Sequence, residues 1–236
     1  MDTDVLIKYF ARVVTLLLVL PLHEASHALI AKCFGDDTAD RQGRISVNPF
    51  VHLDMLGSIL MIFTGFGWAK PVDVDPRKMK NPRAGMAVTA LAGPVSNLIA
   101  AFAAGLGRAC ILATDDGMNA LIDYTFYNKV TTLYCVQLLL DFLMIVNIGL
   151  AVFNIIPIPP LDGFNVMRYF TGPKIDRWFY THYQQIQMGF LAFIIILNLD
   201  IIPDSVNPLL IARNGIYEFM WDDILYKIPA KKWGWD

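Results

Sequence analysis

The feature that most constrains this chain is an apolar run that carries three ionisable side chains. Apolar residues extend from Val13 to Leu22 and resume from Ala28 to Ala31, and His23, Glu24 and His27 lie between them. Ionisable groups at membrane depth are costly in free energy and commonly mark a functional site. The run therefore predicts a membrane-embedded helix with a functional site, in preference to a solvated helix or a structural histidine pair.

The spacing of these three side chains indicates metal chemistry. On a helix, His23 and His27 lie about one turn apart on the same face, so both imidazoles can reach one metal ion. Glu24 projects roughly 100° away from them. It would lie beside the metal but off the ligand axis, where it can accept a proton from water. This is the HExxH arrangement of zinc peptidases, and it predicts two ligands and one catalytic base.

Composition places the chain in a membrane. Of its 236 residues, 56% are hydrophobic and 17% are charged, and the mean hydropathy is +0.47. The net charge of −2 gives no basic field that would attract nucleic acid. The three cysteines are odd in number and contain no CxxC pair, which argues against a disulfide framework and a cysteine zinc site.

Three apolar stretches are long enough to cross the roughly 30 Å of bilayer hydrocarbon: Leu6 to Cys33, Met86 to Ala113 and Leu133 to Ile156. Pro21 removes a backbone hydrogen bond from the first of them and is expected to kink it beside the motif. Met55 to Phe66 is too short to span and predicts a re-entrant or membrane-buried element. Met188 to Ile202 predicts a last, short span.

The residues from Gly67 to Pro76 predict a short β element. Val72 and Val74 lie at strand spacing, and the flanking glycine and prolines, together with Pro71, favour an edge strand. Such an edge could bind an extended substrate by strand addition. The alternative is an interfacial hairpin anchored by Trp68, and the residues alone leave both possibilities open.

Two carboxylates are candidates for a third metal ligand, Asp141 and Asp162. Asp162 is favoured because it follows three prolines in four positions, and irregular backbone at membrane depth is tolerated only where it is buried in protein or lines a cavity. His52 has no partner at a chelating offset and is expected to hydrogen-bond within its loop. Asn97 is expected, on the residues alone, to link helices.

The distribution of lysine and arginine predicts the orientation in the membrane. The loop at 70–83 has five of these residues, the loop at 114–131 has one, and the segment at 168–177 has three. The positive-inside rule then places Asp162 and both histidines towards the cytoplasm. Lys8 and Arg12, at the presumed outer end of the first helix, do not fit this rule.

Five motifs occur in the order typical of one known family. They are His23-Glu24-Ala25-Ser26-His27, the twelve residues from Gly43 to Asp54, Gly67-Trp68-Ala69-Lys70-Pro71-Val72, Gly93-Pro94-Val95-Ser96-Asn97, and the residues from Asn154 to Gly163. In these motifs the chain resembles the site-2 proteases, the intramembrane zinc metallopeptidases, in their compact bacterial and archaeal form without a PDZ domain. It departs from the pattern at Met55, where many relatives have proline, and at Phe164, where many have a second glycine.

The resemblance implies a set of site residues. His23, His27 and Asp162 would bind one zinc ion per chain, and Glu24 would be the catalytic base. Asn97 and Asn154 match family asparagines that lie near the active site. The implied reaction is hydrolysis of peptide bonds in transmembrane or membrane-associated substrates.

The expected protein is an all-α polytopic membrane protein with a core of three transmembrane helices, a small membrane-embedded β element and additional C-terminal helices. We expect one metallopeptidase domain over residues 1–236, with core motifs at 20–165 and an interfacial tail at 205–236, in the cell membrane with the active site towards the cytoplasm. The expected partners are a transmembrane protein or peptide substrate and the lipid bilayer. One alternative is a catalytically silent metal-binding scaffold, against which the intact Glu24 argues. The other is a small transporter, for which inverted repeats are expected and none is visible.

Overall fold

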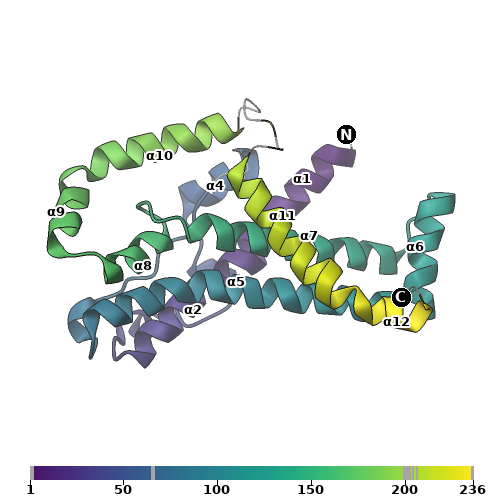
Figure 1. Ribbon diagram of the computed structural model, residues 1–236, viewed down its shortest axis with the longest axis horizontal. Coiled ribbons are helices and arrows are strands. Elements are labelled where there is room, and N and C mark those ends of the chain that lie inside the picture. The colour runs from purple at the N-terminus through teal and green to yellow at the C-terminus, as the bar shows by residue number, and fades with distance from the viewer. Residues whose placement is uncertain (1–2, 65–66, 199–202, 204, 206, 235–236) are drawn as a thin grey trace. The chain divides into compact units, whose positions relative to one another are not determined.

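The chain is predominantly helical in the computed structural model, which describes residues 3–64, 67–198, 203, 205 and 207–234 (Figure 1). The helices of the first half are α1 (Thr3–Val14), α2 (Leu20–Cys33), α3 (Thr38–Arg41), α4 (Met55–Thr64) and α5 (Pro82–Leu112). Those of the second half are α6 (Asp115–Tyr127), α7 (Thr132–Asn154), α8 (Asp162–Phe170), α9 (Pro173–Thr181), α10 (Tyr183–Asn198), α11 (Pro208–Met220) and α12 (Lys227–Trp233). The short helical turns are η1 (Thr15–Val19), η2 (Pro49–Val51), η3 (Pro76–Lys78) and η5 (Trp221–Leu225).

Two compact units make up the fold. Unit 1 contains Met1–Asn97 and Leu150–Asn207, and unit 2 contains Leu98–Gly149 and Pro208–Asp236. The long helices α5 and α7 contribute residues to both units. Every residue that the sequence predicts for the active site belongs to unit 1.

Three described segments are long and apolar enough to cross a membrane, which confirms the expected number of full spans. They are Tyr9–Cys33, Pro82–Leu112 and Thr132–Asn154. The predicted fourth span falls partly on residues 199–202, which lie outside the described residues, and α10 itself has 16 residues. The C-terminal tail, expected at the interface, forms α11, η5 and α12 of unit 2.

The first span contains the predicted disturbance near Pro21. The α-helical pattern is interrupted by the π-helical turn η1, and α2 begins at Leu20 with Pro21 in its first turn. Proline lacks an N–H and clashes with the carbonyl of the residue four positions earlier. A wider turn before it relieves that clash, so the proline is accommodated just before the histidines.

Helix α4 is the short apolar element that the sequence predicts between Met55 and Phe66, and its last two predicted residues, 65 and 66, lie outside the described residues. The Asp54 carboxylate accepts the Gly57 N–H at 2.8 Å. At the other end, the Arg12 guanidinium donates to the carbonyls of Ile62 at 2.7 Å and Phe63 at 3.0 Å. Backbone groups in an apolar environment need such partners. The position of Arg12, which did not fit the charge rule, is therefore explained by its contact with α4.

The predicted β element is not confirmed. Within the described residues, pairing is limited to one antiparallel bridge between Leu53 and Ala69 and a hydrogen bond from Lys70 N to His52 O at 2.7 Å. Pro71 has no N–H to continue the ladder. Residues 70–75 form no strand, and Asp75 at their end has an extended backbone.

Side chains on either side of α3 hold the segment at 70–75 in place. Gln42 donates to the Asp73 carboxylate at 3.0 Å, and the buried Asp36 carboxylate accepts the Asp75 N–H at 2.6 Å. On the other side, a Cβ on Gly57 would lie 2.2 Å from the Trp68 carbonyl, so α4 and the start of the segment pack backbone against backbone. Side-chain hydrogen bonds and close packing therefore fix the position of this segment, as pairing with a second strand would in a sheet.

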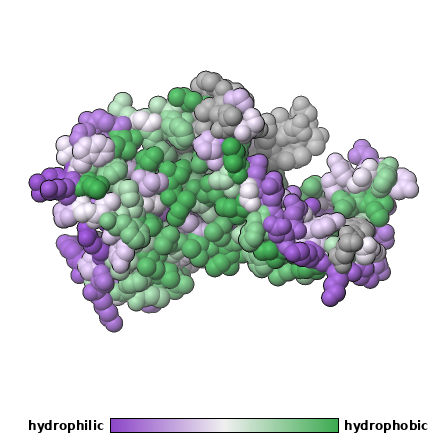
Figure 2. All heavy atoms as spheres, viewed as in Figure 1, coloured by the Kyte–Doolittle hydropathy of each residue, from purple (hydrophilic) through white to green (hydrophobic). Residues whose placement is uncertain are grey.

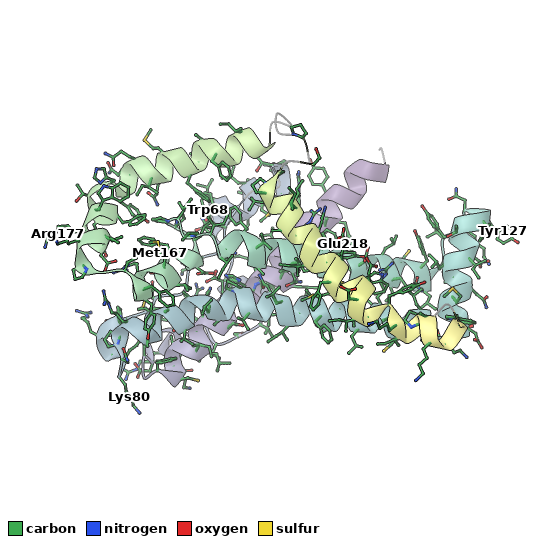
Figure 3. The ribbon with its side chains drawn as sticks, viewed as in Figure 1. Trp68, Lys80, Tyr127, Met167, Arg177 and Glu218 are labelled. Carbon is green, nitrogen blue, oxygen red and sulfur yellow. The ribbon has the colours of Figure 1, made fainter. Side chains whose placement is uncertain are left out.

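Polar and basic residues gather at one end of unit 1. Figure 2 shows hydrophilic side chains at the end where Figure 1 places α9 and the start of α5. Lys80 and Arg177 both lie at this end, whereas Trp68 lies among the helices of the unit (Figure 3). Arg83 joins the two basic segments by donating to the Thr171 carbonyl at 2.9 Å. The two segments that the charge rule assigned to one side are thus neighbours.

Candidate metal centre

The structure brings together the two motif histidines and one of the two candidate carboxylates. His23 Nε2 lies 3.1 Å from His27 Nε2 and 3.1 Å from Asp162 Oδ2, and the distance from His27 Nε2 to Asp162 Oδ2 is 3.4 Å. Both histidines are buried, and Asp162 is half-buried. Three donors from protein, two imidazole nitrogens and one carboxylate oxygen, are the ligand set of many catalytic zinc sites. The donor set therefore fits zinc, with a fourth position left for water.

A hydrogen bond behind His27 selects the tautomer that a metal requires. His27 Nδ1 lies 2.7 Å from the Thr89 carbonyl oxygen, which only accepts, so Nδ1 carries the proton and Nε2 is free to bind metal. His23 Nδ1 lies 3.2 Å from the side-chain amide of Asn97, which is fully buried and whose Oδ1 has no partner. A half-turn of this amide presents Oδ1 to the His23 Nδ1–H. Asn97 can thus orient His23 as Thr89 orients His27.

Helix α5 approaches the histidines at Gly93. A Cβ at this position would lie 2.4 Å from His23 Cε1 and 2.5 Å from His27 Nε2. Glycine is therefore required by close approach of the helix to the two rings. Pro94 follows directly and is accommodated inside α5.

We expect Gly93→Ala to lower zinc affinity about 10- to 100-fold, the cost typical of displaced groups around a metal site. Alanine favours a helix over glycine by about 1 kcal/mol, so helix propensity alone would stabilise the variant. Zinc retained against a competing chelator measures the effect. The control is Gly107→Ala on the same helix, where a Cβ would make an ordinary contact of 3.5 Å with Leu140. Equal zinc retention by both variants would contradict the close packing at Gly93.

The turn between α7 and α8 positions Asp162. Asp162 is the first residue of α8, and a Cβ on the next residue, Gly163, would lie 2.0 Å from the Ile155 carbonyl oxygen. The chain therefore folds back tightly on the end of α7. Burial raises the pKa of Asp162, but hydrogen bonds and charge from the two histidine rings, when these rings are protonated, lower the pKa to about 2. The side chain is ionised at neutral pH, as a metal ligand must be.

A cavity of about 630 Å³ opens beside the three candidate ligands. Glu24 lines it, and its Oε2 accepts a hydrogen bond from the Val72 N–H at 3.2 Å. Asn154 also lines the cavity, and its Nδ2 donates to the Leu150 carbonyl at 3.0 Å. Trp68 lines it too, as do Val72 and Val74 from the segment at 70–75. The base predicted from the sequence thus shares a cavity with the candidate ligands and with the segment for which substrate binding is one of the two possibilities.

Two other candidates from the sequence have partners elsewhere. Asp141 Oδ1, in unit 2, accepts hydrogen bonds from Arg108 at 3.0 Å and from the Tyr217 hydroxyl at 2.7 Å. His52 is buried and its Nε2 lies 2.7 Å from the Ser46 carbonyl within its own loop, as expected. Burial lowers the pKa of His52. Thr89 was not predicted, because a backbone carbonyl acts through its position and carries no side-chain signal.

The comparisons with known proteins identify a peptidase family and two relatives named as zinc metalloproteases. The sequence model of Peptidase family M50 matches residues 11–197. The chain is 38% identical over 184 residues to "Putative zinc metalloprotease YwhC" of Bacillus subtilis, covering 78% of each chain. It is 26% identical over 187 residues to "Putative zinc metalloprotease Rip2" of Mycolicibacterium smegmatis, covering 77% of this chain and 64% of that protein. No solved structure matches the chain.

The family match covers the HExxH helix, the Gly93 approach and the turn that carries Asp162. It covers all three candidate ligands and Glu24, and the described residues include three apolar helices long enough to span a membrane. The chain belongs to peptidase family M50, the site-2 protease family, and is a membrane zinc metallopeptidase.

Proposed function

We propose that this protein hydrolyses peptide bonds of transmembrane or membrane-associated substrates at one zinc site formed by His23, His27 and Asp162. The observation that carries the proposal is the convergence of these three donors beside Glu24 in a single cavity. Two of the donors and the base lie on a helix that is apolar enough to span a membrane. This placement supports peptide-bond hydrolysis at the depth of the membrane.

The chain's own residues divide the work of catalysis. Glu24 accepts a proton from the attacking water and donates it to the leaving amine. Asn154, in the cavity wall, donates a hydrogen bond to the substrate carbonyl oxygen. Zinc, when bound, acts as a Lewis acid that lowers the pKa of water to about 7 and polarises that carbonyl. Thr89 and Asn97 hold the two imidazoles in the tautomer that binds metal.

The cavity fits an extended, apolar substrate segment. Leu20, Met86, Phe153 and Phe190 contribute apolar surface to it, and the Phe153 and Phe190 rings lie 5.8 Å apart. Pro71, Val72 and Val74 of the segment at 70–75 line the cavity. The Val72 N–H already binds Glu24, so pairing with an unwound substrate falls to other backbone groups such as those of Val74. This favours the substrate-binding interpretation of the segment over an interfacial anchor.

We place the active site towards the cytoplasm of a cell-membrane protein. The support is the cluster of basic residues that unites the start of α5 with α8 and α9, together with the excess of lysine and arginine in these loops. Asp162 begins the helix that leads into this cluster.

Purified protein should cleave a model peptide with a single apolar span of about 20 residues. A matched peptide whose span is replaced by polar residues should be cleaved at least about tenfold more slowly, because it lacks the apolar contacts that bind substrate in the cavity. A chelator should abolish cleavage of both, and zinc should restore it. Equal cleavage of both peptides would refute the proposed substrate class, and cleavage that resists chelation would refute the role of zinc.

A further inference from the structure

We propose that Arg44 is a positioning residue that orients the catalytic base Glu24 through a single peptide unit, the one that joins Pro71 to Val72. The inference rests on the proposed role of Glu24 as base. It gives a specific task to the Gly43 to Asp54 motif, which contributes no metal ligand.

Arg44 is a buried cation whose partners are backbone carbonyls. Only 4% of the residue is exposed. Its guanidinium donates to the carbonyls of Val51 and Lys70, and it donates to the Pro71 carbonyl at 2.7 Å. Within the described residues no carboxylate pairs with it. Burying a charge without a counter-ion is costly in free energy. A buried arginine whose partners are backbone carbonyls therefore indicates that fixing the positions of these carbonyls is its role.

The Pro71 carbonyl and the Val72 N–H are the two ends of one planar peptide unit. Arg44 binds the oxygen of this unit at 2.7 Å, and Glu24 Oε2 accepts its N–H at 3.2 Å. Fixing the oxygen therefore fixes the direction in which the N–H points. A positive charge at the carbonyl also polarises the peptide and strengthens its N–H as a donor.

This arrangement assigns separate tasks to the two oxygens of Glu24. Oε2 is held by the Val72 amide, which leaves Oε1 to accept the proton from water. The other anchors of the segment act away from this peptide: Gln42 binds Asp73, and Asp36 binds Asp75. Of these three anchors, Arg44 is the one that contacts the Pro71–Val72 peptide unit, to which Glu24 is hydrogen-bonded.

Arg44→Lys and Arg44→Gln test the inference. Lysine keeps the charge but donates from one nitrogen, so it cannot reproduce the planar fork that bridges separate carbonyls. We expect kcat to fall about 10- to 100-fold in Arg44→Gln, with a smaller fall in Arg44→Lys, while KM changes less than about threefold, as expected for a misplaced catalytic group. Zinc content should stay at the wild-type value, since none of the ligands contacts Arg44. The matched control is Arg41→Lys, which changes an exposed arginine that lies at the end of α3 and pairs with Asp37.

Hydrogen exchange provides a readout that does not depend on activity. The Val72 amide should exchange faster in Arg44→Lys than in Arg41→Lys, with exchange around His23 unchanged. Unaltered kcat with unaltered Val72 exchange would overturn the inference, as would a rise in KM alone or loss of zinc, which would show a substrate-binding or purely structural role. If Arg44→Gln does not fold, Arg44→Lys decides. Failure of the wild type to cleave any peptide would instead refute the proposed function.

Discussion

Glu24→Gln should keep its zinc and its fold but lose peptide cleavage by about 10²- to 10⁴-fold, the usual contribution of general acid–base catalysis. Glutamine has nearly the same shape, and its side-chain oxygen can still accept the Val72 N–H that Glu24 Oε2 accepts at 3.2 Å. It cannot accept a proton from water. The loss should therefore appear in kcat, with little change in KM.

Single-turnover cleavage of the model transmembrane peptide, together with zinc analysis of the same sample, measures both properties. Glu218→Gln is a useful comparison, because it makes the same substitution at an exposed site outside the cavity lining. A Glu24→Gln enzyme with near-normal turnover would exclude Glu24 as the base. Loss of zinc in that variant would show a ligand role instead.

Asp162→Ala should lower zinc affinity by at least about 100-fold, since loss of outer partners alone costs about 10- to 100-fold. Its Oδ2 lies 3.1 Å from His23 Nε2 and 3.4 Å from His27 Nε2, so its removal leaves two ligands. Asp141→Asn should keep zinc, because Asp141 belongs to unit 2 and its carboxylate binds Arg108 and Tyr217.

Zinc content after equilibration with a chelator of known affinity compares the two variants with the wild type. Asparagine at 141 retains an oxygen that can accept from Tyr217, which makes it a milder control than alanine. Zinc loss in Asp141→Asn with retention in Asp162→Ala would reverse the ligand assignment.

The sequence alone determined the features that depend on local periodicity. Apolar runs of sufficient length predicted three spans, and three described segments have that length and composition. The i, i+4 spacing of His23 and His27 placed both rings on one face, because helical geometry requires nothing beyond the helix itself. The prediction of a β element was not confirmed, and the reason lies in long-range contacts. Residues 70–75 are held by the side chains of Asp36, Gln42 and Arg44. Strand propensity, which is a local property of the sequence, contains no information about such partners.

Only the tertiary structure decided which distant groups complete the site. Sequence reasoning favoured Asp162 over Asp141, but the packing of the turn at Gly163 is what places Asp162 beside the histidines. The Thr89 carbonyl and the Asn97 amide reach His27 and His23 through the close approach of α5. Partner choice depends on which segments pack together over long sequence separations. The spacing of residues along one helix carries no information about it, and this is why the motif could be predicted before the groups that orient it.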